Sequence, residues 1–166
     1  MDLIEIKKII NEATDENIWA LFAYLSIQLK ERKLVRTRNI VGERGEFLAI
    51  ETYNNTPGLP NLQSAPEGTQ NIDAISRKGE RYSVKTISLP GSTTGVFYGL
   101  AEPNQNQINQ KFEYLIIVII NKNYELVKML ELDWNQFLRF KKWHTTMRAW
   151  NISITKQILN EARLIA

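Results

Sequence analysis

The sequence contains no cysteine, which excludes disulfide bonds, thiolate catalysis and cysteine-based zinc sites. It has no apolar run approaching the roughly 18 residues of a membrane-spanning helix. The charged residues near the N-terminus, Asp2, Glu5, Lys7 and Lys8, do not resemble a signal peptide. These absences favour a cytoplasmic protein with no membrane partner.

Histidine is nearly absent as well, which limits the chemistry that an imidazole can provide. The one histidine, His144, follows Trp143 in a basic segment. A surface position or a contact with phosphate is favoured there over catalysis.

The chain has 166 residues, of which 43% are hydrophobic and 23% charged, as is ordinary for one globular domain. The net charge of +3 is mildly basic and permits a nucleic-acid partner. Two groups of basic residues contribute to it: Lys30, Arg32, Lys33, Arg36, Arg38 and Arg44, then Arg139, Lys141, Lys142 and Arg148. A solvated helix face is the alternative explanation for both groups.

Three helices are predicted before the middle of the chain. Residues 2–12 and 15–33 carry apolar residues at helical spacing, and a third helix begins near Asn39 and continues to Tyr53. Within that third helix, Gly42 and Gly45 share a face and would let another backbone or a ligand approach closely. The preceding residues 1–35 form a helical segment that is a possible dimer surface.

A β-hairpin is predicted next, with strands at residues 72–76 and 81–87 around a turn that ends at Gly79. Asp73 and Lys85 occupy positions where a half-buried hairpin favours apolar residues. Charges near a core are unfavourable unless they are paired or bound to a metal. The pair therefore indicates either a functional site or a cross-strand ion pair.

The remainder of the chain predicts two further strands and two helices. Residues 54–70 and 89–110 are polar loops, whereas residues 114–120 and 124–130 form a second hairpin. The two hairpins together give a four-stranded mixed sheet in an α/β (α+β) fold. Helices are expected at 133–142, capped by Asp133, and from Ser153 to Leu164, and residues 148–152 are ambiguous.

The segment Ile72-Asp73-Ala74, followed after a turn by Ser83-Val84-Lys85, resembles the active-site hairpin of the PD-(D/E)XK nuclease superfamily. Small type II restriction enzymes of the PvuII kind also place this hairpin early and follow it with an apolar strand. Residues 42–49 are similar to the preceding helix that carries an additional acid in many members. The resemblance spans about residues 38–121 and implies a restriction endonuclease-like core within residues 36–130, followed by C-terminal helices in residues 131–166.

The resemblance also implies a site for Mg²⁺, with Mn²⁺ as a possible substitute. Asp73, Glu46 and the backbone carbonyl of Val84 would ligate the metal, and Lys85 would orient the attacking water. Ser83 stands where the family usually has an acid, so Glu46 would replace that carboxylate and Ser83 would only hydrogen-bond a water.

The implied partner is double-stranded DNA bound by a homodimer. The residues expected to contact the nucleic acid are Arg38, Arg44, Gln70, Asn104, Gln105, Lys142 and His144. Glu43, Glu67 and Asn71 are weaker candidates for the site. Two other classes remain open: a catalytically silent nucleic-acid-binding module on the same fold, which Ser83 favours, and an interaction protein without nucleic acid.

Overall fold

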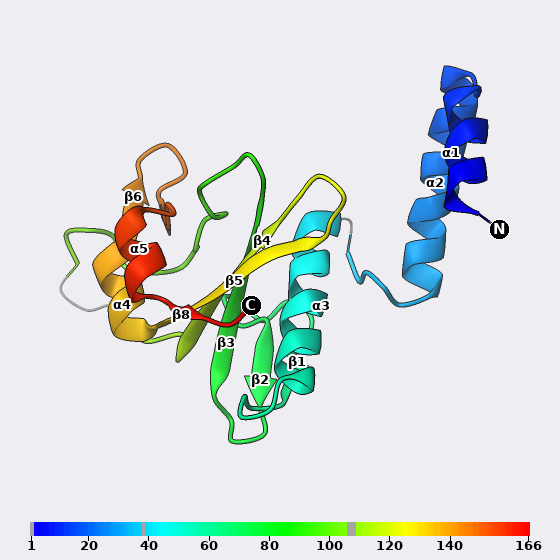
Figure 1. The fold of residues 1–166 in the computed structure, drawn as a ribbon. Coiled ribbons are helices and arrows are strands. Elements are labelled where there is room, and N and C mark those ends of the chain that lie inside the picture. Colours follow the sequence, from blue (N-terminus) through cyan, green and yellow to red (C-terminus); the bar gives the residue numbers. More distant parts are fainter. Residues whose placement is uncertain (1, 38, 106–108) are drawn as a thin grey trace. The chain divides into compact units, whose positions relative to one another are not determined.

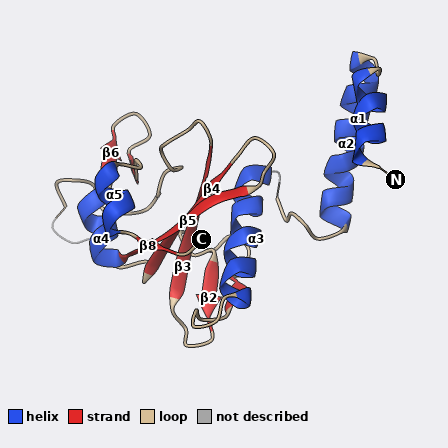
Figure 2. Ribbon diagram, in the orientation of Figure 1, coloured by secondary structure: helices blue, strands red, loops and turns tan. Residues whose placement is uncertain are grey.

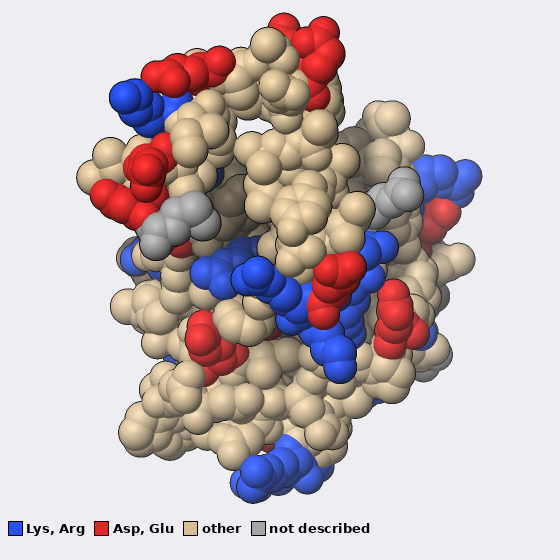
Figure 3. Space-filling view, turned by 90° about the vertical axis from the view of Figure 1, so that its right-hand side faces the viewer, with Lys and Arg blue, Asp and Glu red and all other residues tan. Residues whose placement is uncertain are grey.

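The computed structural model describes residues 2–37, 39–105 and 109–166. The chain divides into two compact units, residues 1–38 and residues 39–166. Among the described residues, no helix is both long and apolar enough to cross a membrane. Figure 3 shows one face of the molecule, on which both Lys and Arg side chains and Asp and Glu side chains are exposed.

The first unit contains two helices, α1 (Leu3–Asn11) and α2 (Asp15–Glu31), separated by residues 12–14. The Asp2 carboxylate accepts a hydrogen bond from the Ile4 N–H, and the Thr14 hydroxyl accepts one from the Asn17 N–H. Both contacts satisfy backbone donors that a helix start leaves unpaired. Both helices were predicted from apolar residues at helical spacing, a pattern that indicates a face packed against a core. Neither helix, however, contains a buried residue.

The second unit is built on a mixed six-stranded sheet with the order β1-β2-β3-β4-β5-β8, counted over the described residues 39–105 and 109–166 (Figures 1 and 2). Its strands are β1 (Leu62–Ser64), β2 (Ala74–Ser76), β3 (Arg81–Ser88), β4 (Tyr114–Ile120), β5 (Leu126–Asp133) and β8 (Arg163–Leu164). Strands β3 and β4 run parallel, whereas the other neighbours are antiparallel.

Strand β4 lies in the middle of this sheet, and every residue from Leu115 to Ile120 is buried. An apolar strand of this kind is expected where both faces of a sheet are covered. One face packs against α3 (Ile40–Asn55) through a cluster that includes Leu48, Tyr53 and Ile116. The other face carries a larger cluster that includes Phe97, Phe112 and Phe137.

Helix α3 begins where the sequence predicts it. The Asn39 side chain caps the helix by accepting from the Gly42 N–H at 3.1 Å. Gly45 faces strand β3 so closely that a Cβ built on it would lie 1.8 Å from Thr86 Oγ1. The absence of a side chain at Gly45 therefore lets helix α3 approach the sheet closely, and the contact with Thr86 sets the separation of α3 from β3.

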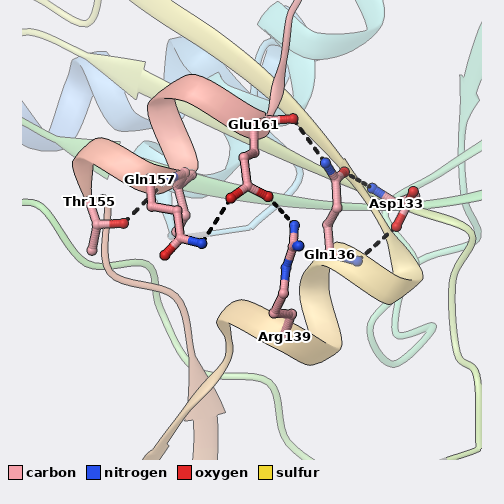
Figure 4. Close-up of polar contacts among 7 residues, drawn as sticks. Asp133, Gln136, Arg139, Thr155, Gln157 and Glu161 are labelled. Atoms are coloured by element: carbon pink, nitrogen blue, oxygen red, sulfur yellow. Dashed lines mark hydrogen bonds and ion pairs between the residues drawn. The ribbon is translucent and has the colours of Figure 1, made fainter.

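A smaller two-stranded sheet and two helices follow strand β5. Strands β6 (Lys142–His144) and β7 (Ala149–Asn151) pair with each other, and the helices are α4 (Trp134–Phe140) and α5 (Lys156–Glu161). Asp133 caps α4 in a capping box with Gln136. Figure 4 shows how the helices are joined: Glu161 accepts from Arg139 and Gln157 side chains, and its backbone carbonyl accepts from Gln136.

Several sequence predictions are corrected here. The main sheet has six strands among the described residues rather than four, because the predicted loop 54–70 contains β1 and the chain end contributes β8. The first hairpin strand begins at Ala74 instead of Ile72. The C-terminal part is not purely helical, since β6 and β7 lie within it. The last helix is capped by Thr155 and ends at Glu161, not at Leu164, because Arg163 and Leu164 pair with β5.

Candidate active site

Asp73 lies directly before β2, at the point where the β2–β3 pairing stops. The last paired residues are Ala74 and Tyr82, and the Asp73 N–H donates to the Tyr82 carbonyl at 2.8 Å. Among the residues that the structure describes, strand β3 continues past this point without a partner strand on that side. The Asp73 carboxylate takes the place of one, because its Oδ2 accepts from the Val84 N–H at 2.6 Å.

The Val84 backbone supplies a second polar group at this place. In an extended strand, the N–H and the carbonyl of one residue point to the same edge. Since the Val84 N–H points to Asp73, the Val84 carbonyl also points to the edge on which Asp73 lies. A carboxylate and a backbone carbonyl therefore share one edge of β3.

Lys85 follows on the same strand in a half-buried position. Its Nζ lies 4.9 Å from the centre of the Phe97 ring, within the range of a cation–π contact. Burial lowers the pKa of Lys85 below its ordinary value, and the negative charges of Asp73 and then Glu46 oppose this decrease. Both carboxylates are thus close enough to act on the Lys85 ammonium.

Glu46 comes to this site from helix α3. It follows Gly45, whose contact with Thr86 brings the helix backbone against β3. Glu43, one turn earlier, is buried at 7% exposure, in contrast to the solvated position that an ordinary helical glutamate occupies. The charges that act on Lys85 of β3 therefore come from helix α3, through Glu46, and from the residue before β2, Asp73.

Ser83 is fully buried, and its Oγ lies 3.3 Å from Asp73 Oδ2. Its hydroxyl carries no charge, so it cannot replace the carboxylate that the resemblance leads one to expect there. Its contact instead adds a second hydrogen bond to the Asp73 oxygen that already accepts from Val84. Ser83 therefore helps to hold the Asp73 side chain in place.

Neither the protein-family models nor the curated proteins give a match to this sequence.

The capacity of the site for a metal follows from its donors. Across the described residues, no group of three or more His, Asp and Glu side chains is placed to hold a metal ion. Asp73, Glu46 and the Val84 carbonyl instead provide two carboxylates and one backbone oxygen. Mg²⁺ binds through oxygen, and it commonly uses one or two carboxylates while retaining several waters. The chemistry of this donor set fits Mg²⁺.

Two of the predicted nucleic-acid contacts from the first half of the chain are placed by the structure. Arg44 Nε donates to the Tyr124 carbonyl at 3.1 Å, so its guanidinium is partly engaged with the β4–β5 turn. Gln70 lies against Gly99, because a Cβ built there would be 2.7 Å from Gln70 Nε2. Arg38 lies outside the described residues. These placements leave the predicted DNA contacts of Arg44 and Gln70 untested.

The predicted contacts from the second half lie on separate elements. Asn104 and Gln105 are exposed, and the Gln105 side chain accepts from the Glu102 N–H at 3.1 Å. Lys142 is exposed on β6, and His144 ends that strand with its Nδ1 accepting from the Met147 N–H. Asn71, a weaker candidate, donates to the Tyr98 carbonyl at 2.7 Å.

Phe97 is the residue of this site that the sequence does not indicate. It is fully buried, and its backbone pairs with Trp150 while its ring lies under the Lys85 ammonium. It occurs in the connection 89–110, which is predicted to be a polar loop. The one feature of the sequence that could have indicated Phe97 is that it is an aromatic residue within that segment.

Proposed function

We propose that this protein is a metal-dependent endonuclease that hydrolyses phosphodiester bonds in double-stranded DNA. The observation that carries the proposal is that the Asp73 carboxylate accepts from the Val84 N–H at the edge of β3, while the charges of Asp73 and Glu46 both act on the neighbouring Lys85. The order of helix, hairpin and buried apolar strand supports it, since α3, β2–β3 and β4 follow one another as the resemblance requires.

Each residue has a definite role in this proposal. Asp73, Glu46 and the Val84 carbonyl would hold Mg²⁺, which supplies charge stabilisation to the phosphate when it is bound. Lys85 orients the attacking water and offsets the negative charge that develops on the phosphoryl oxygens. Ser83 fixes the Asp73 carboxylate, and Phe97 supports the Lys85 side chain from beneath.

A second function is favoured by the identity of residue 83. A site with one carboxylate fewer than the family pattern binds a divalent ion more weakly, and the resulting protein would bind DNA without cutting it. The full burial of Ser83 beside Asp73 is the observation behind this alternative.

The test is cleavage of supercoiled plasmid with Mg²⁺ and, separately, with Mn²⁺. We expect cutting by the wild type, and its loss in Asp73→Asn and in Lys85→Ala. Lys122→Ala, which changes an exposed lysine in the β4–β5 turn, is the matched control and should cut normally. Cutting that persists in both site variants would refute the proposed chemistry.

If the protein is instead a catalytically silent DNA-binding module, the cleavage and binding assays should give different results. Neither metal would produce cutting, and DNA would bind equally well to the wild type and to Lys85→Ala, with an affinity that falls as salt increases. In that case Ser83→Asp, which restores a carboxylate at the family position, is the variant that should gain metal-dependent cutting.

A further inference from the structure

A cavity of about 350 Å³ opens on the α3 side of the main sheet, where strands β3 and β4 begin. Ligand sites commonly measure about 300–1,000 Å³, so this space suits one small molecule. The candidate active site lies elsewhere, because the Lys85 side chain lies over Phe97 in the cluster on the opposite face of the sheet. The polar side chains that line the cavity are Lys78, Glu80, Tyr82, Tyr114, Glu131 and Arg163.

Neighbouring strands build the floor of this cavity. Tyr82 and Tyr114 are partners in the β3–β4 register, and their rings stack with centres 5.1 Å apart. Glu131 and Arg163 are partners across β5 and β8, and Glu131 Oε1 accepts from Arg163 Nη1 at 3.1 Å. The other oxygen, Glu131 Oε2, accepts from the hydroxyl of Tyr53 on α3 at 2.5 Å. These contacts among protein groups fix the side chains, so the cavity is preformed.

The Tyr82 hydroxyl is the group that points to a ligand. Tyr82 is only 2% exposed, yet within the described part of the chain its hydroxyl forms no hydrogen bond. The sealed side-chain oxygen without a partner among those residues is that of Thr86, so the Tyr82 hydroxyl keeps access to the cavity. Burial raises the pKa of Tyr82, and the charges of Glu80 and Glu131 raise it further, so the hydroxyl stays protonated at neutral pH. A buried tyrosine hydroxyl usually has a hydrogen-bond partner, and a bound molecule can provide it.

The charges of the lining are sorted by depth. Glu131 is 6% exposed and lies at the floor, whereas the Arg163 side chain is 57% exposed and Lys78 is exposed as well. An ionised carboxylate only accepts hydrogen bonds, so the floor favours a ligand with N–H donors. Lysine and arginine at the mouth favour an anionic group such as a phosphate. The half-buried Tyr114 adds an aromatic wall for a flat ring.

A nucleoside monophosphate combines a flat base with a phosphate at the other end of the molecule. Among the bases, guanine carries adjacent N1–H and N2–H₂ donors, which match the two oxygens of one carboxylate. We propose that this cavity binds guanosine 5′-monophosphate, with the base edge toward Glu131 and Tyr82 and the phosphate toward Lys78 and Arg163. The proposal does not depend on nuclease activity, because none of these side chains belongs to the candidate active site.

The experiment is calorimetric titration of the full chain with nucleotides in the presence of EDTA, so that no divalent ion can bridge a phosphate to the candidate active site. We expect saturable binding of guanosine 5′-monophosphate. Inosine 5′-monophosphate lacks the 2-amino group, and adenosine 5′-monophosphate lacks the N1–H, so each should bind at least about tenfold more weakly. No binding of the guanine nucleotide would overturn the proposal, as would equal affinity for all three nucleotides or for inorganic phosphate alone.

Two variants locate the binding in this cavity. Tyr82→Phe removes a hydroxyl that has no partner in the described chain, so it should weaken guanosine 5′-monophosphate about tenfold while urea unfolding stays unchanged. Lys78→Ala should weaken the nucleotide but not guanosine, which has no phosphate. Tyr98→Phe and Lys122→Ala change exposed residues outside the cavity and are the matched controls. Wild-type affinity in both Tyr82→Phe and Lys78→Ala would refute this site.

Glu131 also supports Tyr53 and Arg163, so its role is tested by changing the ligand instead of the residue. The comparison of guanosine with inosine 5′-monophosphate serves this purpose, because the two nucleotides differ only in the 2-amino group. Since every titration is made without metal, its outcome is distinguishable from success or failure of the plasmid cleavage assay.

Discussion

The contact between Gly45 and Thr86 leads to a prediction that can be worked through in detail. In Gly45→Ala, the new Cβ would lie 1.8 Å from Thr86 Oγ1 and 2.9 Å from Thr86 Cβ, so α3 must move away from β3. Overpacking of this kind destabilises a protein by about 1–3 kcal/mol. Replacing glycine by alanine in a helix stabilises by about 0.5–1 kcal/mol, so the net loss should be about 0–2.5 kcal/mol.

Urea denaturation measures this loss. With a slope of about 2 kcal/mol per molar urea, the midpoint should fall by up to about 1.2 M. Gly95→Ala is the control, because a Cβ at Gly95 meets no atom within 4 Å. Since Glu46 follows Gly45, Gly45→Ala should also reduce cleavage by more than the loss of folded protein explains.

The double variant Gly45→Ala with Thr86→Ala isolates the cause. Thr86→Ala removes the two outer side-chain atoms that clash, and Thr86 Oγ1 has no hydrogen-bond partner within the part of the chain that the structure describes. Most of the stability lost in Gly45→Ala should therefore return. If Gly45→Ala stabilises the protein, or if the two changes are simply additive, the reasoning is wrong.

Two further predictions concern buried charges. Because burial lowers the pKa of Lys85, the folded protein binds this proton more weakly than the unfolded chain, so charged Lys85 opposes folding at neutral pH. Lys85→Met should therefore raise the melting temperature by a few degrees at pH 7 and abolish cleavage. The gain in melting temperature should vanish as the pH approaches the ordinary lysine pKa of 10.5. An equal gain at both pH values would contradict this prediction. Tyr53→Phe removes a hydroxyl that donates to the buried Glu131 carboxylate at 2.5 Å, and should lower the free energy of unfolding by about 1–3 kcal/mol. Tyr98→Phe, at an exposed tyrosine, is its control in the same urea titration, and equal losses in both variants would argue against a role for the buried contact.

The parts of the fold that the sequence predicts are those with a strong local signal. Helix α3 has its Asn39 cap, and β4 has an uninterrupted apolar run. Strand β1 has neither, because its three residues lie in a segment rich in turn-forming residues. Residues 163–164 lie in a sequence that favours a helix, yet they form β8 because pairing with β5 outweighs local preference.

The candidate site divides in the same way. Asp73 and Lys85 are recognisable because each is a charge within an apolar strand pattern, and Glu46 is recognisable from the preceding helix. The contact of Lys85 with Phe97 is not predictable, since it depends on how the connection 89–110 returns to the sheet. The pairing of Asp73 with the Val84 N–H likewise depends on where β2 ends, which sequence patterns locate only to within a few residues.

The parallel pairing of β3 with β4 has a consequence for how the second unit folds. Helix α3 and strands β1 to β3 can associate through short connections, but β4 must close a segment of about 25 residues before it reaches β3. Until it arrives, the long edge of β3 is open and both apolar clusters lack their shared strand. The slow step of folding should therefore be the insertion of β4, and a nascent or partly unfolded chain would be most prone to aggregate through that open edge.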